Sequence, residues 1–203
     1  MNWIRQSPRS TVPLAQAPRL FATMAPRILA NAYIELMEEA GGSVPRKTGL
    51  DISKFAAALP DVALFATIMP DQCIYRIVGE SWKQRIGLNP VGKNYFDFVA
   101  AERRESAITS LQDLITIPSA FRVIIEQTYS AGRKAELEVL AVPLLSEEEG
   151  VDGFCLFAAQ LVAPIHFGPG DDRIVLGANI VERDLIDIGY GVNDQFFDLV
   201  RPH

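Results

Sequence analysis

Hydrophobic and polar residues alternate in long stretches of the second half of the chain. Such alternation places one side of a β-strand in the interior and the other in solvent. The stretch 151–162 is hydrophobic on both sides, which indicates a central or covered strand. Earlier, two hydrophobic runs are joined by a Met-Pro-Asp-Gln turn, the pattern of a hairpin. The expected strands are 62–68, 73–78, 121–126, 136–145 and 151–162.

Helical periodicity appears before and between these strands. Pro26 and the Gly41-Gly42 pair delimit a helix over 26–40, whose hydrophobic residues recur every three or four positions. These residues are Leu29, Ala32, Tyr33, Leu36 and Ala40. Asp51 can cap a short helix over 52–59 that ends before Pro60. Further helices are expected over 80–86, in a short segment that begins at Tyr95, and over 101–117.

The order of these elements is two strands, several helices and three strands. No strand–helix–strand repeat is present, so the sheet is expected to be antiparallel and the fold class α+β. We predict a five-stranded sheet with short helices on one face, plus an N-terminal helix and a C-terminal extension. The predicted divisions are a flexible basic arm (1–25), a helix and linker (26–50), the main domain (51–163) and the extension (164–203). The extension could add a pair of strands or wrap around the body.

Four short sequence blocks occur in this order across 51–162. They are Leu59-Pro60, Tyr75-Arg76-Ile77-Val78-Gly79, Gly87-Leu88-Asn89-Pro90-Val91-Gly92 and Leu140-Ala141-Val142-Pro143-Leu144. With the order of the elements, these blocks resemble a family of standalone bacterial PAS-like proteins of alphaproteobacterial type. The resemblance implies a PAS fold and a role in sensing or dimerisation. No kinase, cyclase or helix-turn-helix segment follows, so we expect output through contact with a partner protein.

Composition excludes several classes of function. The formal net charge of −6 gives no electrostatic support for binding nucleic acid. No hydrophobic run approaches the roughly 18 residues that span a bilayer, so no membrane segment is expected and a cytoplasmic location follows by elimination. Cys73 and Cys155 both lie in hydrophobic runs and are expected to be buried thiols rather than a disulfide.

Motifs for catalysis and cofactor binding are missing. There is no G-x-S-x-G motif, no complete dinucleotide-binding loop and no P-loop. Light-sensing flavin chemistry of the PAS superfamily needs a helical cysteine, whereas both cysteines here lie in expected strands. His166 is expected to be a surface residue after the last strand, and His203 is far from the domain. We therefore predict no catalytic residue and no metal ligand, and the cofactor stays unknown.

Aromatic residues could line a pocket between the sheet and the short helices, as the resemblance implies. A hydrophobic pocket with a few hydroxyl and N–H groups suits a small apolar ligand. The alternative is that the same rings fill the core. The candidate ligand-binding residues are Tyr75, Trp82, Tyr95, Phe98, Phe121 and Phe154.

Three functions remain open at this point. The first is a non-enzymatic sensory or signalling adaptor that binds an apolar ligand or a partner and forms a homodimer through the Pro26–Ala40 helix. The second is an enzyme acting on a hydrophobic substrate, with Tyr75 and Asp97 as acid–base groups. The third is a protein-interaction module with a closed core. Its binding surface would be the wetter sheet face, which carries Arg76, Arg122, Glu136 and Glu138.

Overall fold

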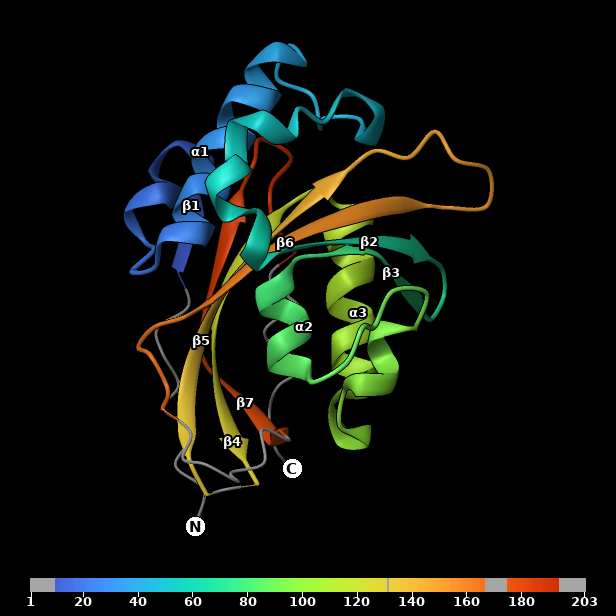
Figure 1. Cartoon of the computed structure of the whole chain (residues 1–203). Coiled ribbons are helices and arrows are strands. Elements are labelled where there is room, and N and C mark those ends of the chain that lie inside the picture. Colours follow the sequence, from blue (N-terminus) through green and yellow to red (C-terminus); the bar gives the residue numbers. More distant parts are fainter. Residues whose placement is uncertain (1–9, 131, 167–174, 194–203) are drawn as a thin grey trace.

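A seven-stranded sheet runs through the protein in the computed structural model, which describes residues 10–130, 132–166 and 175–193 (Figure 1). The strand order in the sheet is β1-β7-β4-β5-β6-β2-β3. The strands are β1 (Ser10–Pro13), β2 (Val62–Ile68), β3 (Gln72–Val78), β4 (Ala120–Tyr129), β5 (Lys134–Leu144), β6 (Gly153–Leu161) and β7 (Val175–Asp187).

Helices cover both faces of this sheet (Figure 1). The α-helices are α1 (Met24–Glu39), α2 (Glu80–Ile86) and α3 (Ala101–Thr116). Short 3-10 helices are η1 (Leu14–Arg19), η2 (Lys47–Gly49), η3 (Ile52–Asp61) and η4 (Tyr95–Phe98). The expected helices are therefore confirmed within about two residues at each end. Asp51 caps η3 as predicted, since its carboxylate accepts a hydrogen bond from the Ser53 N–H at 2.9 Å.

The five expected strands lie side by side in the order β4-β5-β6-β2-β3, and every pairing among them is antiparallel. The predicted count of five is wrong, because β7 pairs with β4 and the short β1 pairs with β7. The β1–β7 pairing is parallel. Described parts of the C-terminal extension thus form one long strand rather than a strand pair.

The prediction of short helices on one face holds for α2, η4 and α3 but is wrong for η3, which lies on the other face with α1. β2, β5 and β6 are buried over most of their length, so side chains on both faces need cover. One face packs against α1, η1 and η3, and the other against α2, η4 and α3. Each face carries its own hydrophobic core, which we call the α1-side core and the α3-side core.

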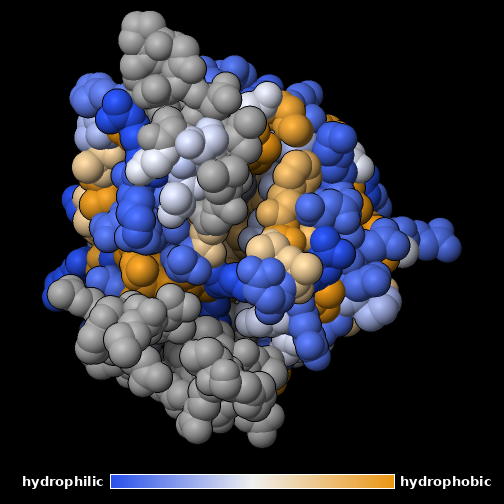
Figure 2. Space-filling model, turned by 90° about the horizontal axis from the view of Figure 1, so that it is seen from below, coloured by the Kyte–Doolittle hydropathy of each residue, from blue (hydrophilic) through white to orange (hydrophobic). Residues whose placement is uncertain are grey.

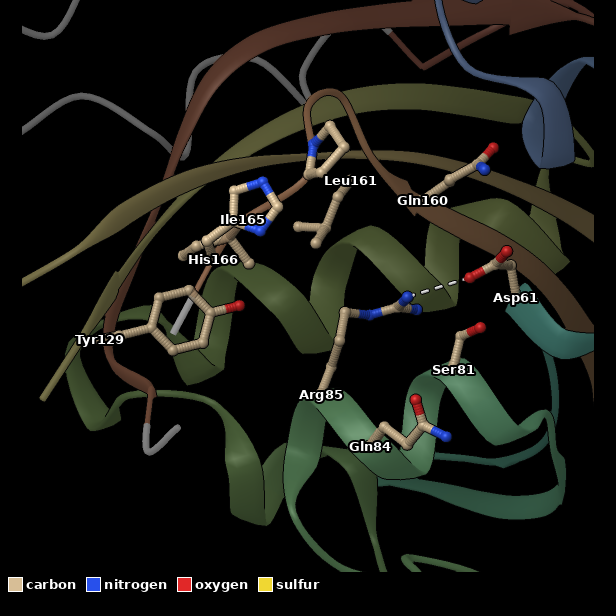
Figure 3. Close-up of a pocket in the computed structure, with 10 residues that line it drawn as sticks. Asp61, Ser81, Gln84, Arg85, Tyr129, Gln160, Leu161, Ile165 and His166 are labelled. Carbon is tan, nitrogen blue, oxygen red and sulfur yellow. Dashed lines mark hydrogen bonds and ion pairs between the residues drawn. The ribbon is translucent and has the colours of Figure 1, made fainter. Parts of the chain in front are cut away.

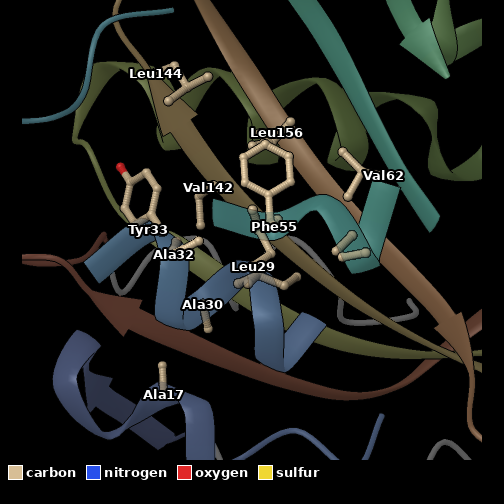
Figure 4. Packing of buried hydrophobic residues seen from close by; sticks show 14 of the residues in the cluster. Ala17, Leu29, Ala30, Ala32, Tyr33, Phe55, Val62, Val142, Leu144 and Leu156 are labelled. Carbon is tan, nitrogen blue, oxygen red and sulfur yellow. The ribbon is translucent and has the colours of Figure 1, made fainter. Parts of the chain in front are cut away.

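The α1-side core uses the hydrophobic stripe that the sequence places on the first helix (Figure 4). Leu29 and Tyr33 are fully buried against the sheet, and the Tyr33 hydroxyl donates to the Pro143 carbonyl at 2.9 Å. Phe55 of η3 fills the neighbouring space. The stripe expected to join two copies is therefore covered within its own chain. Ala40, its last expected member, is exposed.

The N-terminal arm is part of the folded body from Ser10 onward. Ala17 and Phe21 are buried in the α1-side core, at 0% and 2% exposure. β1 adds to the sheet edge, and the Ser10 hydroxyl contacts the Asp184 carboxylate at 2.5 Å. The flexible arm predicted over 1–25 thus does not extend through these residues.

This N-terminal segment buries two charged residues that were expected on a wet sheet face. The Glu138 carboxylate, fully buried, lies 2.7 Å from Arg122 Nε. Its other oxygen accepts from the N–H and the hydroxyl of Thr23, both at 2.7 Å. Arg122 also contacts Glu182 and Asp184, each at 3.0 Å. The wet-face prediction is wrong for this pair.

Arg76 and Glu136, the other two members of the expected wet face, are exposed. Arg76 pairs with Glu148 at 2.7 Å, an ion pair in contact with solvent. The four residues therefore do not form one binding surface, because two of them lie under the N-terminal segment.

Gly79, the glycine between β3 and α2, is in close contact with η3. A Cβ atom at this position would lie 2.2 Å from the Leu59 carbonyl oxygen and 2.3 Å from that of Pro60. We expect Gly79→Ala to lower the free energy of unfolding by about 1–3 kcal/mol, because backbone must move to admit the methyl group. Urea denaturation measures this loss. Gly49→Ala is the matched control, since nothing lies within 4 Å of its Cβ; equal denaturation midpoints for the two variants would refute the close contact.

Candidate functional site

Phe65 is the centre of a group of aromatic rings in the α3-side core. Its ring centroid lies 4.5 Å from that of Tyr75, 4.9 Å from Phe157, 5.7 Å from Tyr95 and 6.0 Å from Trp82. These are the distances of rings in direct contact. The aromatic side chains therefore pack on one another, which is the core-filling alternative stated above.

Four of the six predicted ligand-binding residues meet in this group. Tyr75 contacts Trp82, Tyr95 and Phe98, with centroid separations of 5.9–6.4 Å. Phe98 is 41% exposed and lies at the outer edge. Phe121 is on the same sheet face but reaches the group through Phe157, at 6.0 Å.

Phe154 lies in the opposite core. It pairs with Ala66 and Leu144 across the sheet and packs on the α1 side. Its predicted placement with the other five residues is therefore wrong. Side chains of successive strand residues point to opposite faces of the sheet, and in β6 Phe157 rather than Phe154 faces α3. The sequence analysis also missed Phe65, because a strand hydrophobic at every position gives no signal of which side faces which helix.

The acid–base groups of the enzyme hypothesis do not form a site. Burial raises the pKa of Tyr75 well above its usual value, and it raises the pKa of Tyr95 to about 12. Both hydroxyls thus stay protonated at neutral pH. Asp97 is exposed to solvent. A solvent-exposed carboxylate and a buried phenol give no support for proton transfer to a bound substrate.

A cleft of about 570 Å³ opens elsewhere, between α2 and the ends of β4 and β6 (Figure 3). Arg85 rises from α2 into the middle of it, and Tyr129 of β4 points its hydroxyl into the same space. Seen from below, hydrophobic residues gather near the centre of the face and in smaller patches among hydrophilic ones (Figure 2). The cleft is lined by Asp61, Ser81, Gln84, Arg85, Tyr129, Gln160, Leu161, Pro164, Ile165 and His166.

Arg85 joins three elements at the base of this cleft. Its Nη1 lies 3.0 Å from Asp61 Oδ1 at the end of η3, and its Nη2 donates to the Ala159 carbonyl of β6 at 2.8 Å. The guanidinium also lies 5.6 Å from the centre of the Trp82 ring. Burial lowers the pKa of Arg85, and Asp61 opposes that shift. Arg85 thus stays charged, with its charge balanced by its neighbour.

Tyr129 and Gln160 are each held by a hydrogen bond, the first within β4 and the second to α1. The Tyr129 hydroxyl contacts the Gln127 side-chain oxygen at 3.0 Å, and burial raises the pKa of Tyr129 while Arg85 lowers it. Gln160 Oε1 accepts from the Ala25 N–H at the start of α1, at 2.8 Å. Hydrogen bonds to the rest of the fold therefore hold these two lining side chains in place.

Almost none of this cleft was predicted from the sequence. His166 was expected on the surface, and it is exposed at the rim. The other lining residues come from four separate segments, and no spacing in the sequence indicates that these meet. Within 10–130, 132–166 and 175–193, no group of three or more His, Cys, Asp or Glu side chains is placed to hold a metal ion. Cys73 and Cys155 are buried free thiols, as predicted.

Comparisons with known proteins give distant structural similarities. No family model matches the chain, and no curated protein matches its sequence. A fungal LOV domain photoreceptor is 14% identical with a TM-score of 0.37, covering 57% of this chain and 94% of its own. VqmA of Vibrio cholerae in a ligand–DNA complex is 13% identical with a TM-score of 0.36, and the match covers 55% of this chain and 51% of that one. An RsLOV variant is 13% identical with a TM-score of 0.37, and the match covers 57% of this chain and 71% of that one.

Similarities at this level do not establish a fold family or a function. None of the described helices combines the length and the hydrophobicity needed to cross a membrane.

Proposed function

We propose that this chain is a non-enzymatic sensory or signalling domain of PAS-like architecture that binds a small molecule in the cleft beside α2. The cleft is the observation that carries the proposal. Its volume of about 570 Å³ lies within the range of small-molecule sites, roughly 300–1,000 Å³. The aromatic group around Phe65, in contrast, is filled by its own rings.

The arrangement of elements over 62–161 supports the PAS-like part of the proposal. β2 and β3 come first, α2, η4 and α3 follow, and β4, β5 and β6 complete the unit. The cleft lies beside the first of the helices, where a bound molecule would touch α2 and two strands at once. A ligand there can change how α2 packs, which is a simple route from binding to a signal.

The polar groups of the cleft support binding rather than catalysis. Arg85 is held by Asp61 and a backbone carbonyl, and Tyr129 contacts Gln127. No serine or cysteine among the described lining residues lies within hydrogen-bond distance of a histidine or carboxylate that could activate it.

One edge of the sheet exposes hydrophobic side chains that could contact a partner protein. β3 is the edge strand, and Ile77 is 60% exposed on it. The segment after α2 follows this strand, since the Gly92 N–H donates to the Tyr75 carbonyl at 2.9 Å, and it exposes Leu88 and Val91. This edge suits a regulatory contact better than the outer surface of α1 does.

Native mass spectrometry of the purified full chain tests the proposal. We expect a retained small molecule in the natural chain and none in Ser81→Trp, because the indole would occupy the cleft. Ser43→Trp adds the same group at an exposed position outside the lining and serves as the control. A natural chain with no retained mass, or equal retention in Ser81→Trp, would argue against this function. Light scattering on the same samples reports the oligomeric state.

A further inference from the structure

Charge inside the cleft is balanced by the protein itself. Arg85 and Asp61 form an ion pair at 3.0 Å, and their side chains are only 14% and 18% exposed. An anionic ligand at Arg85 would lie next to the Asp61 carboxylate, and a cationic ligand at Asp61 would lie next to the guanidinium. Either arrangement adds like-charge repulsion in a partly buried space, where such repulsion is strong. An uncharged ligand avoids both costs.

Hydrogen-bond donors remain available toward the cleft. A backbone N–H can only donate, so the contact with Ala25 fixes the oxygen of the Gln160 amide toward α1. The Gln160 NH₂ group, on the other side of the amide, has no acceptor among the described residues. Arg85 has five N–H donors, and its contacts with Asp61 and Ala159 leave some of them for a ligand.

Three of the remaining lining residues supply hydrophobic surface. Leu161 is the last residue of β6, and Pro164 and Ile165 lie in the segment after it; they face α2 across the cleft, as Figure 3 shows for Leu161 and Ile165. His166 is exposed beyond them at the rim. A molecule seated here would place a hydrophobic part against this wall and a polar atom toward Arg85 and Gln160.

We propose that the cleft selects an uncharged small molecule that carries a carbonyl oxygen on a hydrophobic body. The inference rests on the proposed function and specifies its ligand. The carbonyl oxygen would accept from Gln160 and Arg85 without disturbing the Arg85–Asp61 pair, and the hydrophobic body would pack on the Leu161–Ile165 wall.

Three probes with the same phenylalkyl body and different charge test this selection. They are 4-phenylbutanamide, 4-phenylbutanoate and 4-phenylbutylamine, titrated separately into the isotopically labelled full chain while backbone amide resonances are followed by NMR. We expect the amide to shift resonances of the cleft and to bind at least about fivefold more tightly than either charged probe. This ratio corresponds to about one hydrogen bond or one close charge contact.

Gln160→Glu isolates the donor. The carboxylate keeps an oxygen for the Ala25 N–H, so α1 retains its contact, but the NH₂ donor is lost. We expect the affinity for 4-phenylbutanamide to fall about three- to tenfold, the range that one hydrogen bond contributes. The affinity for 4-phenylbutylamine is expected to rise. Gln72→Glu makes the same change at an exposed position of β3, outside the cleft, and should leave all three affinities unchanged.

Each of the other outcomes would overturn the inference. These are tightest binding of a charged probe, an unchanged affinity for the amide in Gln160→Glu, or no shift of cleft resonances with any probe. A small molecule retained in native mass spectrometry would still support the proposed function in all three cases. The two proposals can therefore fail separately.

Discussion

Replacing Phe65 with alanine is expected to lower the free energy of unfolding by about 3–5 kcal/mol, the loss typical of a large aromatic residue removed from a core. Phe65 is fully buried, and four other rings lie around it with centroids within 6.0 Å. None of these rings can close the space without leaving its own contacts. Urea denaturation followed by Trp82 fluorescence measures the loss, because Trp82 is one of the four neighbours.

Phe98→Ala provides the comparison within the same group of rings. Phe98 is 41% exposed and lies 5.9 Å from Tyr75, so we expect a loss of about 1 kcal/mol or less. If Phe65→Ala cost no more than Phe98→Ala, the rings would border an open space rather than fill the core. That result would favour ligand binding in the aromatic pocket that was predicted from the sequence.

The aromatic group illustrates how far the sequence pattern reaches. Hydrophobic runs and alternation located β2 to β6 and the turn between β2 and β3 correctly, but they missed β1 and β7. Alternation failed inside β2 and β6, because almost every position there is buried and a period of two leaves no polar residue to mark the outer face. Phe65 was overlooked and Phe154 was assigned to the wrong side for this same reason.

Replacing Glu138 with alanine is expected to cost about 3–5 kcal/mol, the range measured when one partner of a buried ion pair is removed. Glu138 is fully buried and accepts hydrogen bonds from Arg122 and from two groups of Thr23. The alanine variant leaves these donors without their acceptor between the sheet and the N-terminal segment. Thermal or chemical unfolding measures the loss, and hydrogen exchange of α1 should rise most.

Two further variants separate the charge of Glu138 from its packing. Glu138→Gln keeps the size and one oxygen acceptor, so we expect a smaller loss than with alanine. Glu148→Ala removes the partner of Arg76, in an ion pair that is exposed on both sides, and should change stability little. A Glu138→Ala variant as stable as Glu148→Ala would show that the buried pair does not hold the N-terminal segment in place.

The sequence could not have indicated this arrangement. Charged residues alternating with hydrophobic ones are typical of a strand with a wet face, and Arg122 and Glu138 fit that pattern. Their burial depends on residues about a hundred positions earlier, from Ser10 to Thr23. That stretch contains Pro13 and Pro18 and looks like a loose arm, since no hydrophobic periodicity shows what it packs against. The cleft was missed for a related reason, because its lining comes from distant segments.

The position of β7 in the sheet has a consequence for the order in which the chain can fold. β7 is the last described strand in the sequence, yet it lies between β1 and β4. During synthesis, the ten-residue β4 therefore has a neighbour on its β5 side only, until residues 175–187 have left the ribosome. β1, which precedes β4 in the sequence, must wait even longer than β4 for its neighbour. This side of the sheet is completed by β7 and β1 together, and this late step protects β4 from pairing with other molecules.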